Sequence, residues 1–322
     1  MTRRLEADAV GIAEAGQMLA QGRLVAFPTE TVYGLGADAT NPKAIAALYT
    51  AKGRPHFNPL IAHVPDIASA FSLGVFDSHA RALAVAFWPG PMTLVVPVSH
   101  HGLVCDLARA GLDSLAIRVP SDPVAQHILR VAGCPIAAPS ANRSGHVSPT
   151  HAEHVLADLG GSIDAVVDGK ASAIGLESSI FACLDGVVTI LRPGAITSSA
   201  AEAILGCPIL HPTTTRDAAP RAPGRLESHY APNAPMRLNA QDVRLGEACL
   251  AFGSFPLAGS DPALTLNLSP SGDVLEAAAN LYAMMRALDS RKPSGIAVMP
   301  IPQLGLGVAI TDRLRRSAAP RT

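Results

Sequence analysis

The segment 52–63 contains the residues whose types and spacing are best suited to chemistry. Lys52 is one of four lysines in the 322-residue chain, and it stands two positions before Arg54. Two prolines in this segment remove backbone donors and fix φ, so the residues after Lys52 are not expected in a helix interior. A rigid loop that carries a lysine charge, the Arg54 guanidinium and the Asn58 amide is suited to binding phosphate or carboxylate. These residues alone leave a surface turn with solvated cations open as the alternative.

Two more polar segments follow short apolar runs that are typical of buried strands. Residues 28–39 follow the run 24–27, and residues 139–145 follow the run 135–138. Both segments supply hydroxyls and amides just beyond the carboxyl end of a strand, which is where open α/β sheets bind ligands. Each is an ordinary polar turn when it is taken alone. With the segment 52–63 they form a combination that is typical of one family.

The chain resembles bacterial threonylcarbamoyl-AMP synthases of the longer, two-domain type, whose first domain is YrdC-like. The resemblance covers nearly the whole chain and rests on eight blocks in the family's order. The blocks are PTETVYGLGADA (28–39), KGRPHFNPLIAHV (52–64), FWPGPMTLVV (87–96), LAIRVPSD (115–122), APSANRSG (138–145), ESSI (177–180), LRPGAI (191–196) and SHYAP (228–232). The resemblance implies an α/β protein: a YrdC-like twisted open mixed sheet with flanking helices, and a smaller C-terminal Rossmann-like α/β domain.

The same resemblance implies an enzyme, a nucleotidyltransferase that condenses L-threonine, bicarbonate and ATP into threonylcarbamoyl-AMP and pyrophosphate. The product would serve t6A37 modification of tRNA through a downstream transferase complex. By matching position, Lys52 and Arg54 are the expected catalytic residues. The expected threonine-binding residues are Thr31, His63, Arg118, Ala138 and Ser178. The expected ATP-binding residues are Lys52, Arg54, Asn58, Ser114, Ser140, Asn142, Ser148, Arg192 and Tyr230. Mg²⁺ is expected to bind with ATP through phosphates and waters, without a metal site made by the protein.

Composition agrees with a folded protein. Hydrophobic residues make up 48% of the chain and charged residues 16%, which argues against disorder. The net charge of −1 gives no sign of nucleic-acid or membrane affinity. Five cysteines are scattered without a CxxC, a pattern typical of reduced thiols in a cytosolic protein. No targeting signal and no apolar run of membrane-spanning length is visible, so a cytoplasmic location is expected.

Helical and strand patterns alternate along the chain, which favours an α/β fold. Helices are expected near 7–20, 43–51, 78–87, 122–132, 151–159, 198–205, 273–288 and 308–317. Strands are expected near 24–27, 93–98, 115–119, 135–138, 164–167, 178–183, 187–192, 248–252 and 295–299. The stretch 208–235 contains six prolines and no periodicity. We therefore expect a catalytic domain (1–207), a Pro-rich linker that closes over the nucleotide (208–235) and a C-terminal domain (236–322).

Charge is distributed unevenly between the two expected domains. Residues 1–206 carry 13 Lys and Arg against 17 Asp and Glu, whereas residues 207–322 carry 12 against 9. An acidic first domain that nevertheless places cations in its best motifs is expected to gather them in one positive cavity. These cations are Lys52, Arg54, Arg118, Arg143 and Arg192. Pairing of Arg118 and Arg192 with acids elsewhere is the alternative.

One further motif match is weak, and two other functions remain alternatives. Residues 34–39 match GxGxxA after a strand, but the acidic residue expected about 20 positions later in a dinucleotide site is missing. No P-loop motif occurs, so an ATP site would be of another kind. An RNA-binding module and a carbamoyl transferase of the hydrogenase-maturation type remain alternatives. The first would need a basic run and more aromatic residues, and the second would need cysteine-rich zinc motifs and an acylphosphatase-like module.

Overall fold

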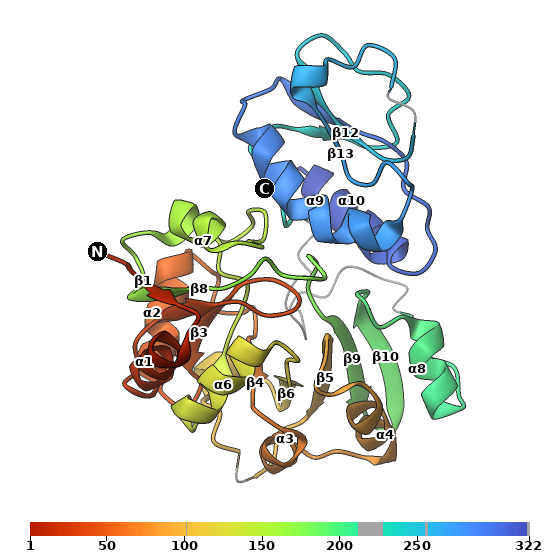
Figure 1. Cartoon of the computed structure of the whole chain (residues 1–322). Coiled ribbons are helices and arrows are strands. Elements are labelled where there is room, and N and C mark those ends of the chain that lie inside the picture. Colours follow the sequence, from red (N-terminus) through yellow and green to blue (C-terminus); the bar gives the residue numbers. More distant parts are fainter. Residues whose placement is uncertain (101, 212–227, 255–256, 321–322) are drawn as a thin grey trace.

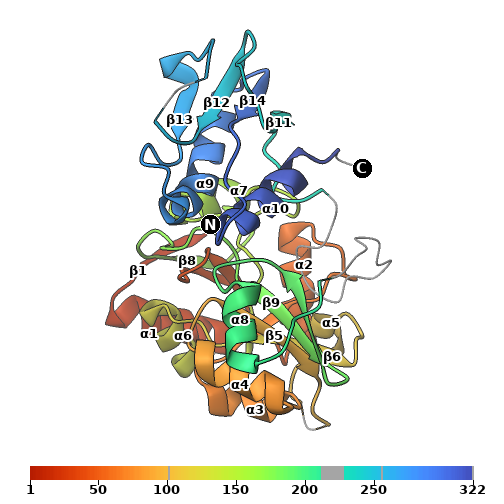
Figure 2. The ribbon, with the colours of Figure 1, turned by 90° about the vertical axis from the view of Figure 1, so that its right-hand side faces the viewer.

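The computed structural model describes residues 1–100, 102–211, 228–254 and 257–320. Its strands form two sheets, one of ten strands in the N-terminal part and one of four strands in the C-terminal part (Figure 1). The two parts lie one above the other, with helices between the two sheets (Figure 2). The expected mixed α/β fold with a second, smaller unit is therefore confirmed.

The described strands and helices follow the expected alternation. The strands are β1 (Arg3–Glu6), β2 (Val25–Phe27), β3 (Gly34–Asp38), β4 (Ile61–His63), β5 (Met92–Pro97), β6 (Ser114–Arg118), β7 (Ile136–Ala137), β8 (Ala165–Asp168), β9 (Ser179–Leu184), β10 (Val187–Arg192), β11 (Met236–Arg237), β12 (Glu247–Ala251), β13 (Thr265–Asn267) and β14 (Gly295–Val298). The helices are α1 (Ala9–Ala20), α2 (Pro42–Lys52), α3 (Ile67–Leu73), α4 (Ser78–Phe87), α5 (Asp106–Arg109), α6 (Pro123–Ala132), α7 (Ala152–Leu159), α8 (Ser198–Leu205), α9 (Val274–Asp289), α10 (Gly307–Ala318) and the 3₁₀ turn Pro262–Leu264.

Side-chain caps explain where several helices begin. Asp8, Asn41, Asp77, Asp122 and Asp273 precede α1, α2, α4, α6 and α9, and each accepts a hydrogen bond from a backbone N–H of the first turn. These amides have no partner inside the helix, so the caps stabilise each start by about 1 kcal/mol. Proline also stands in the first turn of α2 and α6, where its missing N–H costs nothing.

The large sheet has the order β1-β8-β2-β3-β7-β4-β6-β5-β9-β10 and mixes parallel with antiparallel pairs. The short strand β7 lies in the middle, antiparallel to both β3 and β4. Strand β4 runs parallel to β6, with His63 opposite Arg118. Strand β5 joins β6 to β9, with Thr93 opposite Ile180. The carboxyl ends of β4 and β6 therefore lie side by side.

Residues 34–38 form the buried strand β3, although the sequence analysis treated them as part of a polar turn. The glycines are needed because neighbouring segments of the same chain lie very close to this strand. A Cβ added at Gly36 would lie 2.7 Å from the Phe27 ring and 3.0 Å from Leu19. The GxGxxA match at 34–39 is therefore a packing feature of a strand, because its glycines lie within β3 and not in a loop between a strand and a helix, as a dinucleotide site requires.

Strand β6 separates two layers of the domain. Leu115 and Ile117 point into the main hydrophobic core, whereas Ala116 packs in a small separate cluster with Ile61. Because side chains alternate along a strand, Arg118 lies on the same face as Ala116. This face of the sheet carries the polar residues described below.

The C-terminal unit has four parallel strands in the order β11-β14-β12-β13. Helices α9 and α10 lie on the side of this sheet that faces the first domain (Figures 1 and 2). Most of the predicted linker, residues 212–227, lies outside the described residues, and residues 228–235 lead into β11. In the described part of the chain, no helix is long and apolar enough to span a membrane.

Candidate active site

A small buried cavity lies at the carboxyl ends of β4 and β6. Its volume is about 40 Å³. It is lined by Thr31, Val32, Arg54, Ile61, His63, Arg118, Ala138, Pro139, Ser140, Glu177, Ser178, Arg192, His229 and Tyr230. Nine of the fourteen predicted site residues are in this set: Thr31, Arg54, His63, Arg118, Ala138, Ser140, Ser178, Arg192 and Tyr230. Segments that are far apart in sequence thus meet at one point.

Lys52 is the last residue of α2, and only 3% of it is exposed. Its Nζ donates hydrogen bonds to the backbone carbonyls of Ser140 and Asn142. The expected loop position and the alternative of a solvated surface cation are both wrong for Lys52, because it still belongs to α2 and is buried, with the C-cap Gly53 after it. Burial and the neighbouring Arg54 hold the pKa of the Lys52 ammonium well below its usual range.

Arg54 lies in the turn that follows α2 and is also buried. It donates to the carbonyls of Asn58, over 3.3 Å, and Pro59, over 3.0 Å. Burial lowers the pKa of its guanidinium to about 10. The Asn58 side chain lies beside it with neither Oδ1 nor Nδ2 paired in the described structure. The segment after Lys52 therefore presents one guanidinium and one unsatisfied amide.

Arg118 has both of the roles that were expected as alternatives, because it lines the cavity and also pairs with an acid. It lines the cavity, and its guanidinium forms an ion pair with Glu30 at 2.6 Å. Burial would raise the pKa of the Glu30 carboxyl, but the Arg118 charge together with hydrogen bonds from Arg118 and from backbone groups lowers it. Arg192 also lines the cavity, and it donates to the carbonyl and the hydroxyl of Ser178.

Three further lining residues, Thr31, Ser178 and His63, supply two hydroxyls and a neutral imidazole. The Thr31 and Thr29 hydroxyls lie 2.8 Å apart, and the Ser178 hydroxyl lies 2.8 Å from that of Thr93. Burial and the nearby Arg118 charge lower the pKa of His63 to about 3, so its ring is neutral at pH 7. These groups can donate and accept hydrogen bonds without adding negative charge.

Other predicted residues do not line the cavity, and only some of them lie next to it. Asn142 donates to two backbone carbonyls and keeps its Oδ1 unpaired, and Ser148 donates to the Glu177 carboxylate over 2.5 Å. Ser114 starts β6, so it lies at the opposite end of this strand from Arg118. Arg143 is exposed and donates to the Asp158 carbonyl. The expectation that Arg143 joins the other cations in the cavity is therefore wrong, because its side chain leaves the loop on the outer side.

Tyr230 and His229 line the cavity from the last part of the predicted linker, residues 228–235. Tyr230 is 1% exposed and has a φ of 61°, a left-handed conformation that is uncommon for a tyrosine. Its ring contacts the His229 ring at a centroid distance of 4.1 Å. Burial raises the pKa of Tyr230 and lowers that of His229 to about 3, so both side chains are neutral at pH 7.

Unsatisfied polar atoms gather around this site. In the described residues, seven of the eight buried side-chain atoms without a hydrogen-bond partner belong to cavity residues or to their direct neighbours. They are Glu30 Oε2, Asn58 Oδ1 and Nδ2, Arg118 Nε, Asn142 Oδ1, His229 Nδ1 and the Tyr230 hydroxyl. Burying such an atom unpaired costs about 1–3 kcal/mol, so the cluster indicates a place where a polar ligand completes the hydrogen bonds.

Sequence reasoning missed three ionisable members of the site: His229 and the two carboxylates Glu177 and Glu30. Both carboxylates stand inside blocks that carried the resemblance, ESSI and PTETVYGLGADA, but a carboxylate is not an obvious choice for an anion-binding site. Glu177 accepts hydrogen bonds from Ser148, Tyr282 and Arg313. Tyr282 and Arg313 belong to α9 and α10, and no pattern in the sequence connects them to this site.

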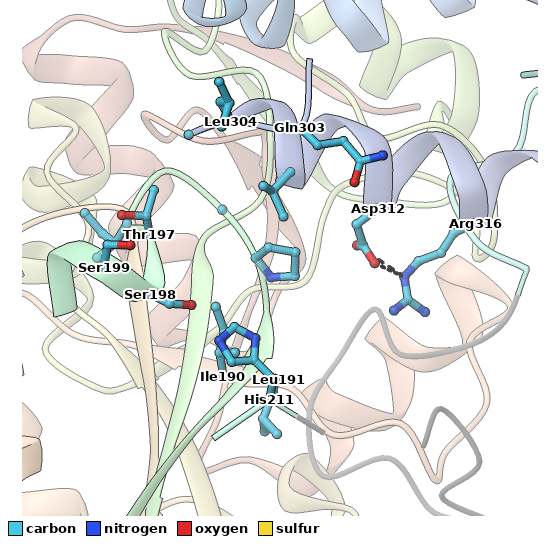
Figure 3. Close-up of a pocket in the computed structure, with 15 residues that line it drawn as sticks. Ile190, Leu191, Thr197, Ser198, Ser199, His211, Gln303, Leu304, Asp312 and Arg316 are labelled. Carbon is cyan, nitrogen blue, oxygen red and sulfur yellow. Dashed lines mark hydrogen bonds and ion pairs between the residues drawn. The ribbon is translucent and has the colours of Figure 1, made fainter. Parts of the chain in front are cut away.

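A larger cavity, of about 560 Å³, lies at the junction of the two domains (Figure 3). On one side it is lined by the end of β10 and the start of α8, and on the other by residues 303–316. Asp312 and Arg316 form an ion pair of 3.1 Å at its edge (Figure 3). Its lining contains none of the fourteen predicted site residues. The candidate active site is therefore the smaller cavity, where charge and unsatisfied polar atoms converge.

The fold and the site together define a class: a two-domain α/β protein whose first domain carries a cation-lined cavity at its strand ends. The family described as "Telomere recombination" matches residues 17–194, and the family described as "Threonylcarbamoyl-AMP synthase, C-terminal domain" matches residues 196–319. The chain belongs to the threonylcarbamoyl-AMP synthase family.

Individual relatives agree over the whole length. A threonylcarbamoyl-AMP synthase of Bacillus subtilis is 39% identical over 335 residues, which cover 100% of this chain and 96% of the relative. One of Pyrococcus abyssi is 35% identical and covers 95% of this chain and 94% of the relative. The crystal structure of P. abyssi Sua5 complexed with L-threonine has a TM-score of 0.89 and 33% identity, and it covers 99% of this chain and 97% of that chain. The resemblance that the sequence blocks predicted is confirmed.

Proposed function

We propose that this chain condenses L-threonine, bicarbonate and ATP into threonylcarbamoyl-AMP and pyrophosphate, for t6A37 modification of tRNA. The observation that carries the proposal is the convergence of Arg54, Arg118 and Arg192 on one buried cavity, with Lys52 directly behind it. All reactants carry negative charge, and fixed cations in a buried site stabilise such an assembly strongly.

The threonine side of the site would be the end of β4 and β6. Arg118 Nε has no partner in the described structure and would bind the substrate carboxylate. The hydroxyls of Thr31 and Ser178 and the neutral ring of His63 would bind the amine and the side chain, beside the backbone of Ala138. The free amine would attack the carbon of bicarbonate, which gives a carbamate with loss of water.

The nucleotide side would be formed by the expected ATP-binding residues. Lys52, Arg54 and Arg192 would bind the phosphates, with Ser140, Asn142, Asn58, Ser148 and Ser114 along the rest of the molecule and Tyr230 above it. A carbamate oxygen would attack the α-phosphorus, and the bond to the β-phosphate oxygen would break to release pyrophosphate. Catalysis would come from positioning and charge stabilisation, without a covalent intermediate.

With a volume of about 40 Å³, the cavity is far smaller than the roughly 300–1,000 Å³ that is typical of ligand pockets. ATP binding would therefore require the segment that carries His229 and Tyr230 to move. Mg²⁺ would enter with the triphosphate and would bind mainly through phosphates and waters. We place the catalytic domain at 1–207, the linker at 208–235 and the second domain at 236–322, in a cytoplasmic protein.

The decisive experiment follows the label and the leaving group together. The chain is incubated with ATP, labelled threonine and bicarbonate, and a threonine-labelled adenylate is sought by chromatography. Pyrophosphate release should require threonine and bicarbonate together, because the attacking carbamate forms only when both are present. Equal release with ATP alone would identify a simple ATPase. A gel shift of RNA without ATP would support the alternative of an RNA-binding module. Activity with carbamoyl phosphate in place of threonine would support the alternative of a carbamoyl transferase.

A further inference from the structure

Two residues of the C-terminal domain contact a carboxylate that lines the cavity. Arg313 of α10 donates from Nε to Glu177 Oε2 over 2.8 Å, and the Tyr282 hydroxyl of α9 lies 3.0 Å from the same oxygen. Arg313 is 0% exposed and also donates to the Pro193 carbonyl, next to Arg192. In the described structure, Ser148 is the further donor to Glu177. The second domain thus supplies two of its three hydrogen-bonding side chains.

The same helix holds the segment above the cavity. The Ser317 hydroxyl donates to the Tyr230 carbonyl over 2.9 Å, and the His229 N–H donates to the Arg316 carbonyl over 3.1 Å. The Arg313 guanidinium lies 5.3 Å from the centre of the Tyr230 ring, and the Tyr282 ring stacks on the Tyr230 ring at a centroid distance of 5.9 Å. These contacts hold Tyr230 in its left-handed conformation, which costs about 1–3 kcal/mol for a residue other than glycine.

The charge of Glu177 makes this arrangement necessary. A buried carboxylate beside an anion site would repel phosphate and would compete for the nearby Arg192. Burial alone would raise the pKa of Glu177, but the charges of Arg313 and Arg192, with hydrogen bonds from Ser148 and Arg313, lower it to about 2. The carboxylate is therefore ionised, and Arg313 supplies a balancing charge that comes from outside the catalytic domain.

We propose that Arg313 and Tyr282 are positioning residues for the nucleotide side of the active site. Arg313 neutralises Glu177 so that Arg192 can face a phosphate, and both residues fix Tyr230 over the cavity. This inference rests on the proposed function, and it gives the C-terminal domain a direct part in ATP binding. The threonine side, which Glu30 and Arg118 organise within the first domain, does not depend on these contacts.

The test compares two cross-domain arginines. Arg313→Met removes the positive charge beside Glu177. Arg286→Met removes a cross-domain ion pair with Asp158, 2.7 Å long, together with hydrogen bonds to the backbone carbonyls of Val147 and Ser148, and Arg286 contacts neither the Glu177 carboxylate nor Tyr230. Arg313→Met should raise the KM for ATP at least about tenfold and leave the Kd for threonine within about twofold. Arg286→Met should keep both constants within about twofold of those of the unmodified chain. Equal effects of the two variants would reduce Arg313 to a residue of domain docking and overturn the proposal.

Two further variants keep the test decisive if Arg313→Met does not fold. Tyr282→Phe keeps the ring and removes only the hydroxyl, so it should fold and raise the KM for ATP about threefold to tenfold. An unchanged KM for ATP in Tyr282→Phe would overturn the proposal. Adding Glu177→Gln to Arg313→Met should restore part of the thermal stability, because the unpaired buried charge is gone.

The outcome for the unmodified chain separates this inference from the proposed function. An unmodified chain that forms no threonine-dependent adenylate would refute the proposed function itself. If the unmodified chain is active and the variants Arg313→Met and Tyr282→Phe have the same KM for ATP as the unmodified chain, the positioning role alone is refuted.

Discussion

Arg118 and Glu30 form a 2.6 Å ion pair in which each partner keeps one polar atom unpaired, Nε of the arginine and Oε2 of the glutamate. The pair joins the end of β6 to the loop between β2 and β3. Because the described contact uses the Nη2 nitrogen, the Nε edge of the guanidinium remains available to a carboxylate. Glu30 thus orients the cation that we propose to bind the threonine carboxylate.

Glu30→Gln tests this orientation. The amide keeps a similar size but loses the charge that holds Arg118, so the KM for threonine should rise about tenfold while the KM for ATP stays unchanged. Arg118→Lys should have a larger effect, because an ammonium cannot bind a carboxylate with two parallel hydrogen bonds. Glu153→Gln, which removes a surface carboxylate paired with Arg4, is the matched control and should alter neither constant. A threonine KM in Glu30→Gln equal to that of the control would refute the role of the pair.

Replacing Lys52 should reduce both activity and stability. Its buried Nζ holds two carbonyls of the 140–142 loop, so Lys52→Met should lower the rate at least about 100-fold and also lower the melting temperature by several degrees. Lys43→Met, on the exposed side of the same helix, is the control and should change neither property. Activity and melting temperature are measured on the same preparations. Full activity in Lys52→Met would exclude a catalytic role for this lysine.

The Asn58 side chain should contribute to ATP binding without contributing to stability. Its two polar atoms have no partner in the described structure, so Asn58→Leu removes no protein hydrogen bond and should leave the melting temperature unchanged or higher. The KM for ATP should rise about tenfold. Ser172→Ala removes another buried unpaired group that does not line the cavity, and it should leave the KM unchanged. A stable Asn58→Leu variant with an unchanged KM would remove Asn58 from the nucleotide site.

Stability should fall as the pH is lowered from 7 to 5. His63 and His229 have pKa values of about 3 in the folded chain and about 6.5 in the unfolded chain, so the unfolded state binds more protons in this range. Each histidine should therefore lower the free energy of unfolding by about 2 kcal/mol between pH 7 and pH 5. Chemical denaturation at the two pH values measures the difference. His229→Asn should reduce it and the exposed His127→Asn should not; equal stability at both pH values would contradict the prediction.

The sequence predicted most of the elements and most of the site. Helix caps and apolar runs are local signals, and the expected ranges 78–87 and 198–205 coincide with α4 and α8. The cavity residues were found because they stand in blocks that resemble a family, and nine of them do converge. The assignment of each residue to threonine or to ATP stays a prediction.

What the sequence did not predict depends on distant contacts. β3 was taken for part of a turn because glycine is uncommon in strands. At Gly36 the glycine is needed because the side chains of Phe27 on β2 and Leu19 on α1 lie too close for a Cβ. The burial of Lys52 was not predicted because its partners, the carbonyls of Ser140 and Asn142, lie about 90 positions away. Arg313 was assigned to a short basic helix, and only the packing of two domains shows that this arginine is buried against Glu177.

The strand order also constrains how the chain is made. β7, the central link between β3 and β4, follows them by more than 70 residues, and β1 pairs with β8 some 160 residues later. While the chain emerges from the ribosome, β3 and β4 therefore each expose an unpaired edge until residues 136–137 arrive. The entropy of loop closure is lost before distant strands form any stabilising contact. This domain should therefore fold late and slowly. A nascent chain arrested before β7 should bind chaperones, and one released after β10 should not.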